Sequence, residues 1–286
     1  MSTVYLDGAY VPKDDAKVSV DDRGFLFGDG VYEVTPCYRG VTFLLERHLD
    51  RLRRGLAWMR IGFDESALES VFRRLLADNG LEDVETSLCY VQITRGVAPR
   101  SHPFPTGAVE PTVYAFAKAW MRPTPERWKK GFRAITVPDL RWSRVDVKTI
   151  ALLPNVLAYQ AGVEAGVDDV IQVRDGIALE GAHNNLFAVF DGTIATHPLT
   201  NVVLPGVTRG LVVELARENH IPVEERPIAV EELATADEIF FTGTTSEIKP
   251  TVEVDGRPVA DGRVGPVTKV LSKAFQRRIE RAKQGG

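Results

Sequence analysis

Apolar residues recur at helical spacing in two stretches of the N-terminal half. The first stretch forms one apolar stripe with charges around it, at steps of four and three: Leu45, Leu49, Leu52, Leu56 and Met59. The second lies near residues 65–78, where Leu68, Phe72 and Leu75 keep the same spacing. Because residues three and four apart share one face of a helix, both stretches predict amphipathic helices.

Strand patterns and turn residues cover most of the remaining chain. VYLDGAYVP predicts a hairpin around Asp7-Gly8, and Asp-Gly pairs at 175–176, 191–192 and 255–256 predict further tight turns. Strand-like runs broken by glycines follow in DDRGFLFGDGVYEVTPCYRGVTFLL. Further strands are predicted in LCYVQITRG, PTVYAFAKAW, FRAITVP, DDVIQVRDG, NLFAVFDGTIATHP, EIFFTGTT and PTVEVDG. Helices are predicted near 153–165, 208–219 and 266–283.

The stretch Met121-Arg122-Pro123-Thr124-Pro125 is the candidate linker between two domains. Its two prolines remove backbone donors and stiffen the chain. We therefore expect a small N-terminal domain at 1–118, a linker at 119–125 and a larger C-terminal domain at 126–286. Strands and helices occur in both parts, which indicates an α+β fold.

Composition and charge exclude several classes of protein. The 286 residues are 44% hydrophobic and 26% charged, which is ordinary for a globular chain that can enclose a cofactor pocket. The net charge of −4 does not indicate nucleic acid or an anionic membrane as a partner. No apolar run approaches the roughly 20 residues of a membrane helix, and the N-terminus lacks a signal-peptide pattern. Cys37 and Cys89 have no metal-type spacing, so we expect reduced thiols, no metal site and a cytoplasmic location.

Two charged residues stand in apolar segments. Lys148, in RWSRVDVKTIALLPN, follows a predicted strand, and a lysine amine becomes a nucleophile when its charged form is disfavoured. Glu180, in DGIALEGAHNNLF, has its side chain on the opposite face of the predicted strand from Ile177 and Leu179. A buried Glu180 needs a cationic partner, such as a protonated pyridine nitrogen. The alternatives are a solvated lysine and an exposed glutamate.

Three segments have features that suit an anion. Arg51 lies on the first predicted helix, where it either turns inward to an anion or belongs to the solvated face. In LPGVTRGLVVELA, Gly206 and Thr208 begin a helix, whose free N–H groups and dipole attract phosphate. In FFTGTTSE, Thr244 and Thr245 follow a strand, next to a glycine that permits close backbone approach. An ordinary cap or turn is the alternative for the last two.

The Pro-rich segment RGVAPRSHPFP contains Arg95, Arg100 and His102. Arg100 and His102 are two residues apart, so in an extended loop they face the same way. Together they suit a carboxylate, whose geometry matches the planar guanidinium. A solvated basic loop is the alternative.

Taken together and in this order, the motifs resemble those of D-amino acid aminotransferases, members of the fold-type IV pyridoxal-phosphate enzymes. The resemblance extends from DRGFLFGDGVYEV, through HLDRL, TRGVAPRSHPFP, RWSRVDVK and EGAHNNLF, to LPGVTR and TGTTSEIKP. It implies a small α/β N-terminal domain and a larger C-terminal domain with a β-barrel-like core flanked by helices. It also implies pyridoxal 5'-phosphate as cofactor, and a homodimer in which Arg100 and His102 serve the partner's site.

By the same resemblance, Lys148 is the catalytic Schiff-base lysine and Glu180 the partner of the pyridine nitrogen. The phosphate is assigned to Arg51, Val207, Thr208, Thr244 and Thr245. The substrate, with its α-carboxylate, is assigned to Tyr32, Tyr90, Arg100 and His102. One segment departs from the family, because Ala182-His183-Asn184 stands where small hydroxyl residues are usual; we expect His183 to be a packed residue.

The resemblance implies reversible amino transfer between D-amino acids, such as D-alanine and D-glutamate, and 2-oxo acids. Alternatives within the same fold are an (R)-amine or branched-chain L-aminotransferase and aminodeoxychorismate lyase. A carrier that binds the cofactor without turnover is the alternative from another class. The Arg100-Ser101-His102 sequence favours the D-type enzyme over the first two.

Overall fold

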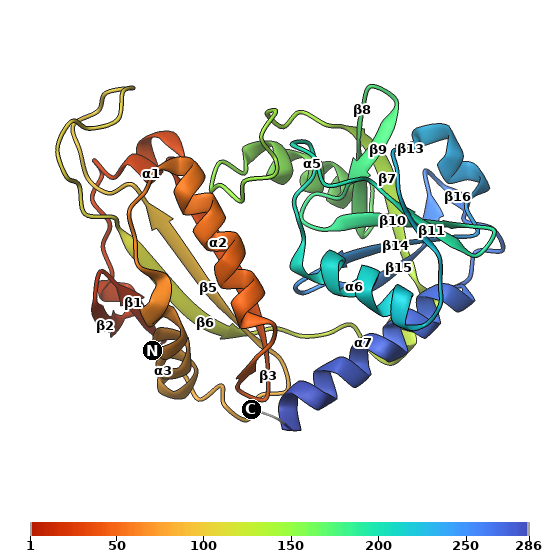
Figure 1. The fold of residues 1–286 in the computed structure, drawn as a ribbon, viewed down its shortest axis with the longest axis horizontal. Coiled ribbons are helices and arrows are strands. Elements are labelled where there is room, and N and C mark those ends of the chain that lie inside the picture. Colours follow the sequence, from red (N-terminus) through yellow and green to blue (C-terminus); the bar gives the residue numbers. More distant parts are fainter. Residues whose placement is uncertain (1, 285–286) are drawn as a thin grey trace. The chain divides into compact units, whose positions relative to one another are not determined.

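The computed structural model describes residues 2–284, which form two compact units (Figure 1). The first unit contains residues 2–121, 147–151 and 282–284, and the second contains residues 122–146 and 152–281. Within the described residues, no helix combines the length and apolar character needed to cross a membrane. Over the same range, no group of three or more His, Cys, Asp or Glu side chains is arranged to hold a metal ion. The proposed linker at 119–125 stays a prediction, which limited proteolysis can test.

The sheet of the first unit is antiparallel, in the order β2-β1-β6-β5-β3-β4. Its strands are β1 (Thr3–Leu6), β2 (Ala9–Pro12), β3 (Gly30–Tyr38), β4 (Val41–Thr42), β5 (Ser87–Thr94) and β6 (Val113–Ala119). Asp7 and Gly8 have φ angles of 48° and 91°, in the left-handed region that tight hairpins require. The predicted hairpin is confirmed.

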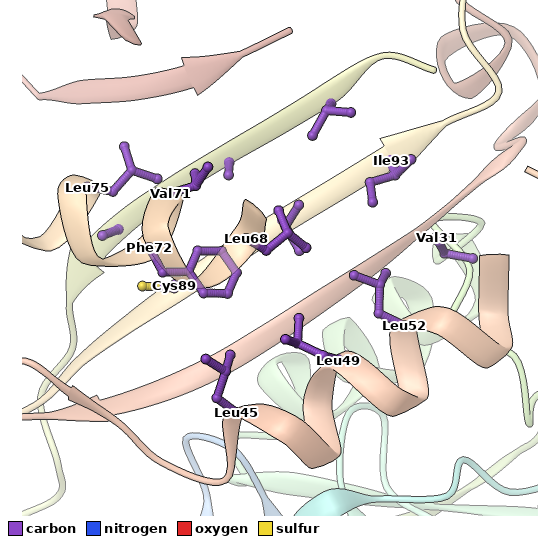
Figure 2. Packing of buried hydrophobic residues seen from close by; sticks show 14 of the residues in the cluster. Val31, Leu45, Leu49, Leu52, Leu68, Val71, Phe72, Leu75, Cys89 and Ile93 are labelled. Atoms are coloured by element: carbon purple, nitrogen blue, oxygen red, sulfur yellow. The ribbon is translucent and has the colours of Figure 1, made fainter. Parts of the chain in front are cut away.

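Two amphipathic helices pack their apolar faces on this sheet, and the hydrophobic core of the unit lies between them and the strands (Figure 2). The helical elements are α1 (Arg23–Phe27), α2 (Leu45–Met59), α3 (Leu68–Asp78) and short 3-10 turns at Lys13–Asp15 and Glu65–Ala67. Figure 2 shows Leu49 and Leu52 of α2 and Phe72 and Leu75 of α3 pointing at the strands. Phe72 and Leu75 are almost completely buried. The helical spacing in the sequence therefore identified both helices and their buried faces.

The second unit is built on a closed ring of six strands. The strands are β7 (Phe132–Pro138), β8 (Asp169–Arg174), β9 (Ile177–Glu180), β10 (Asn185–Phe190), β14 (Glu238–Gly243) and β15 (Glu247–Val254). They pair in the order β10-β14-β15-β7-β8-β9, and β9 returns to β10 through the pair Glu180–Asn185. The β-barrel-like core expected from the resemblance is confirmed, and Glu180 lies where the ring closes.

Short strands extend this ring and helices pack around it. The added strands are β11 (Thr193–Thr196), β12 (Val223–Glu225), β13 (Ile228–Ala229) and β16 (Arg257–Pro258). The helices are α4 (Pro125–Lys130), α5 (Leu153–Glu164), α6 (Val207–Glu218) and α7 (Pro266–Gln284), with a 3-10 segment at Val230–Thr235. The predicted strands and the three predicted C-terminal helices are confirmed. All three Asp-Gly turns have left-handed φ at both residues.

Candidate active site

Lys148 lies in the segment 147–151, which belongs to the first unit. The segment pairs with the start of β3, because the Tyr32 N–H donates to the Lys148 carbonyl at 3.1 Å and the Ile150 N–H donates to the Gly30 carbonyl at 3.1 Å. The Lys148 Nζ atom lies 4.0 Å from the centre of the Tyr32 ring, in a cation–π contact. The strand that precedes Lys148 in the sequence ends at Pro138, ten residues earlier. Lys148 is therefore held by backbone pairing with β3 and not by that preceding strand.

Tyr32 also contacts Tyr90, so three of the predicted site residues lie together. The two tyrosine rings stack with centres 5.6 Å apart, and Tyr90 stacks in turn on Phe116. The Tyr90 hydroxyl donates to Gln92 Oε1 at 2.8 Å. Burial, with smaller contributions from Tyr32 and another tyrosine, raises the pKa of Tyr90 well above its usual value. Tyr90 is therefore a neutral hydrogen-bonding group at physiological pH.

Arg51 points inward from α2, as one of the two interpretations of the sequence predicted. Its side chain is 7% exposed and forms a two-pronged ion pair with Glu33 on β3, with Nε–Oε2 and Nη2–Oε1 distances of 2.8 and 2.7 Å. His48, one turn earlier on α2, lies 3.0 Å from the same carboxylate. Burial alone would raise the pKa of Glu33, but Arg51 and His48 hold that pKa far below its usual value.

Sequence reasoning missed Glu33 and His48. Two signals were available: Glu33 is a carboxylate within the otherwise apolar run VYEVT, and His48 is three residues from Arg51 on the same helical face. Burial lowers the pKa of His48, so this ring stays neutral beside the Glu33–Arg51 ion pair. The three side chains form one buried polar group in which Glu33 fixes the guanidinium of Arg51.

Arg100 and His102 lie in the exposed part of the loop between β5 and β6. The guanidinium carbon of Arg100 is 5.3 Å from the centre of the Phe27 ring, and the His102 ring centre is 5.7 Å from it. Both side chains therefore contact one ring, and their shared role in binding a carboxylate stays a prediction.

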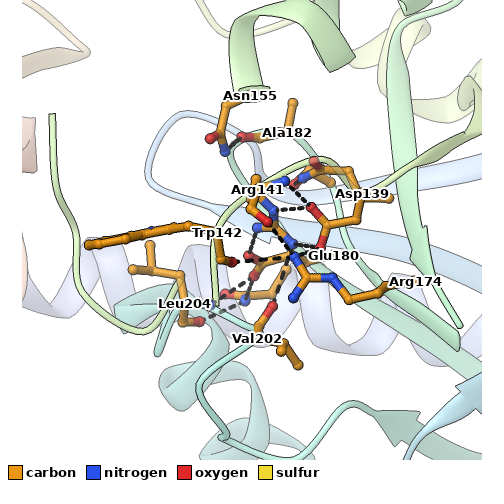
Figure 3. A network of polar contacts seen from close by, with 12 residues as sticks. Asp139, Arg141, Trp142, Asn155, Arg174, Glu180, Ala182, Val202 and Leu204 are labelled. Carbon is orange, nitrogen blue, oxygen red and sulfur yellow. Dashed lines mark hydrogen bonds and ion pairs between the residues drawn. The ribbon is translucent and has the colours of Figure 1, made fainter. Parts of the chain in front are cut away.

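Glu180 is 4% exposed and belongs to the second unit. Figure 3 shows Arg141 between Glu180 and Asp139, and Arg141 donates to both carboxylates. Asn185 Nδ2 and the Leu204 N–H also donate to Glu180 Oε2, at 2.8 and 3.1 Å. The exposed-glutamate alternative is therefore wrong. The cationic partner present is Arg141, which sequence reasoning missed although it lies within the quoted RWSRVDVK motif.

The Glu180 carboxylate retains the capacity to bind a further donor. Burial raises its pKa above the usual value, while Arg141 and the Leu204 N–H oppose that rise. A carboxylate has about four lone-pair sites, and three donors occupy sites here. A second cation at the remaining site would stabilise the ionised form, which makes Glu180 suited to a protonated ring nitrogen.

The first turn of α6 is suited to an anion. Its N-cap residue, Gly206, provides no side-chain cap, and no acidic residue occupies the first turn. A Cβ atom at residue 206 would lie 2.0 Å from Asn185 Oδ1, so a larger residue there would displace the Asn185 side chain. The N–H groups of Val207 and Thr208 thus lie in the positive end of a 12-residue helix. Thr244 and Thr245 are half-buried in the turn between β14 and β15 of the same unit.

The departing segment Ala182-His183-Asn184 is held from both sides. Asn155 Nδ2 donates to the Ala182 carbonyl at 2.7 Å, and Asn184 Nδ2 donates to Asp169 at 2.7 Å. His183 is exposed, and its ring meets the Tyr159 ring edge-on at 5.2 Å. The His183 ring therefore packs against another side chain at the surface.

The predicted site residues are divided between the two units. Those in the first are Tyr32, Arg51, Tyr90, Arg100, His102 and Lys148; those in the second are Glu180, Val207, Thr208, Thr244 and Thr245.

Comparisons with known proteins match this chain to aminotransferases. Residues 30–254 match the family model described as amino-transferase class IV. The chain is 40% identical over 282 residues to a D-alanine aminotransferase of Staphylococcus haemolyticus, covering 98% of this chain and 99% of that one. It is 38% identical over 278 residues to a D-alanine aminotransferase of Bacillus licheniformis, covering 96% of each. Among solved structures, the branched-chain amino acid aminotransferase of Escherichia coli has a TM-score of 0.86 at 30% identity, with 96% of this chain and 93% of that chain covered.

Proposed function

Because the chain belongs to the amino-transferase class IV family, it is a pyridoxal-phosphate-dependent aminotransferase, and we propose that its amino donors are D-amino acids such as D-alanine and D-glutamate. The acceptors are 2-oxo acids. The observation that carries this proposal is that Arg100 and His102 both contact the Phe27 ring. In this arrangement they offer two donors to an α-carboxylate. The identity of about 40% to D-alanine aminotransferases over nearly the full length supports it.

The residues present fit the cofactor. The start of α6, which has no side-chain cap, suits a phosphate. The buried Glu180 carboxylate, which accepts from three donors and has about four lone-pair sites, suits a protonated pyridine nitrogen. When bound, pyridoxal phosphate supplies a conjugated ring that stabilises the negative charge left on the substrate Cα. In the proposal, Glu180 keeps the proton on the ring nitrogen, and Arg51 with the N–H groups of Val207 and Thr208 holds the phosphate. Thr244 and Thr245 complete the phosphate contacts.

Lys148 is assigned to covalent attachment of the cofactor and to proton transfer at the substrate Cα. The ring of Tyr32, 4.0 Å from Nζ, gives this amine a defined position. As a free amine, Lys148 would take the proton from Cα as general base, and the ammonium so formed would then donate a proton as general acid. Tyr32, Tyr90, Arg100 and His102 are assigned to the substrate and its carboxylate.

We propose that the enzyme is a homodimer in which Arg100 and His102 serve the partner's site. One face that suits a second copy is α5, where Leu153, Val156, Leu157 and Val163 are all more than half exposed. Light scattering should give twice the 31.6 kDa of one chain. A cytoplasmic location stays a prediction from the sequence.

One assay separates this function from its alternatives. D-alanine is paired with 2-oxoglutarate, while L-leucine and an (R)-arylamine are each paired with 2-oxoglutarate and with pyruvate, and amino transfer is followed. The proposal requires transfer from D-alanine to exceed that from the other two donors. A preference for L-leucine would instead favour a branched-chain enzyme, the activity named for solved structures 26–30% identical to this chain. Release of pyruvate from aminodeoxychorismate without an amino acceptor would indicate the lyase.

Arg51→Lys should weaken cofactor binding while the fold persists. A lysine keeps a cation beside Glu33, whose burial makes an unpaired charge costly, but it loses the planar two-pronged geometry. We expect a loss of about 1–2 kcal/mol, or about 5- to 30-fold in Kd, measured by equilibrium dialysis. Arg54→Lys, at an exposed position on the same helix, is the control. Unchanged retention of cofactor in Arg51→Lys would remove Arg51 from the phosphate site.

Glu180→Gln should slow turnover with the cofactor still bound. The amide keeps a hydrogen-bonding oxygen near Asn185 and Leu204 but carries no charge to hold the proton on the ring nitrogen. We expect kcat to fall by roughly a factor of ten, which corresponds to about 1.4 kcal/mol in the barrier. The half-buried Glu253 on β15 provides a matched Glu→Gln control. A kcat equal to that of the unmodified enzyme would exclude the assigned role.

A further inference from the structure

A buried cluster centred on Asp29 joins α1 to the loop that carries Arg100 and His102. Asp29 is 7% exposed and lies between two arginines, Arg23 at 2.8 Å and Arg95 at 2.8 and 2.9 Å. Burial raises the carboxyl pKa, but hydrogen bonds from Arg95 and Arg23 outweigh it and hold the pKa below its usual value. Asp29 is therefore a fixed negative charge that orients both guanidinium groups.

Arg95 fixes the beginning of the loop. It directly follows β5, and its guanidinium also donates to the carbonyls of Arg60 and Met59 at 3.1 and 2.7 Å. Its own N–H donates to the Asp29 carbonyl at 3.0 Å. The first residue of the loop is thus tied to the end of α2 and to Asp29.

Arg23 fixes the exposed part of the loop. Its side chain is 3% exposed, and besides Asp29 it reaches two successive carbonyls, Ser101 at 2.6 Å and His102 at 3.5 Å. The ring of Phe27 lies one turn after Arg23 on α1 and contacts three side chains. Its centre is 4.7 and 5.3 Å from the guanidinium carbons of Arg23 and Arg100, and 5.7 Å from the centre of the His102 ring. Arg23 therefore holds the main-chain carbonyls of residues 101 and 102, and the side chains of Arg100 and His102 contact Phe27.

From this geometry we propose that Arg23 is a positioning residue, which with Asp29 and Phe27 holds Arg100 and His102 in the arrangement that binds a substrate carboxylate. The inference rests on the proposed function, in which Arg100 and His102 bind that carboxylate. Fixing an exposed loop before binding removes the entropy that ordering it would otherwise cost. Arg23 is assigned a role through the loop and not through the substrate, because its side chain is 3% exposed and donates to Asp29, Ser101 and His102.

The test is Arg23→Lys, which keeps a cation beside Asp29 but cannot reach two carbonyls and a carboxylate together. We expect KM for D-alanine to rise about tenfold with kcat within about twofold of the parent enzyme. Hydrogen exchange should become faster across residues 97–110. Arg127→Lys is the matched control, because Arg127 also bridges a carboxylate, Asp168, and a carbonyl, Gly131, in the other unit.

A double variant separates positioning from a general structural role. If Arg23 acts through Arg100, Arg23→Lys combined with Arg100→Ala should have a KM within about twofold of Arg100→Ala alone. Independent, multiplying effects would overturn the proposal. Phe27→Leu keeps apolar volume at α1 but removes the shared ring, and it must also raise KM; it carries the test if Arg23→Lys fails to fold.

The two hypotheses fail in different ways. If Arg100→Ala raises KM but Arg23→Lys and Phe27→Leu do not, the positioning role is wrong and the proposed function stands. If Arg100→Ala leaves KM unchanged, the carboxylate assignment fails, whatever the exchange rates of the loop show.

Discussion

Lys148→Ala should abolish amino transfer and the visible absorbance of the covalently bound cofactor. The substitution removes both the amine that attaches the cofactor and the group that moves the Cα proton. General acid–base catalysis alone contributes about 10²- to 10⁴-fold, so we expect kcat to fall by at least that factor. Stopped assays with D-alanine and 2-oxoglutarate measure the loss, and absorbance spectra measure the bound cofactor.

A second lysine controls for the simple loss of a cation beside an aromatic ring. Lys118, exposed on β6 of the same unit, lies 5.9 Å from the centre of the Phe116 ring. Lys118→Ala should leave both turnover and spectrum unchanged. Borohydride reduction followed by peptide mapping identifies the attached lysine directly, and a label on any residue other than Lys148 would show the assignment to be wrong.

Arg100→Ala should raise KM sharply for D-alanine and D-glutamate. A 2-amino acid differs from a simple amine chiefly in its α-carboxylate, and Arg100 provides the planar donor pair that matches it. Loss of one hydrogen bond to a charged group costs roughly 1.5–3 kcal/mol, which is about 10- to 150-fold. The exposed position of Arg100 makes a large loss of fold stability unexpected.

The control for this substitution is a donor without a carboxylate. In an isolated half-reaction, an (R)-arylamine should lose much less than D-alanine, because it makes no contact that depends on Arg100. The half-reaction must be isolated, since the 2-oxo acid acceptor uses the same residues. Equal losses for both donors would mean that Arg100 supports the loop or the dimer, and the D-amino acid assignment would lose its main support.

The sequence by itself determined most of the regular structure and the family. Apolar spacing located α2 and α3, Asp-Gly pairs located the tight turns, and ordered motifs across the chain identified the cofactor class. Helix and strand periods are local signals, because each can be recognised within about 11–18 residues of sequence. Strands of two or three residues, such as β12, β13 and β16, were missed because they are too short to show a period.

Only the tertiary structure decided how the charged residues are paired. Arg51 meets Glu33 across 18 residues, Arg141 meets Glu180 across 39, and Asp29 meets Arg95 across 66. No periodic pattern encodes such pairs, because they depend on which strand and helix faces the fold brings together. The same reason explains the return of residues 147–151 to the first unit, where pairing with β3 holds Lys148 against Tyr32. The sequence indicated which residues carry charge in apolar surroundings, and burial in the folded chain selected the partner that each one requires.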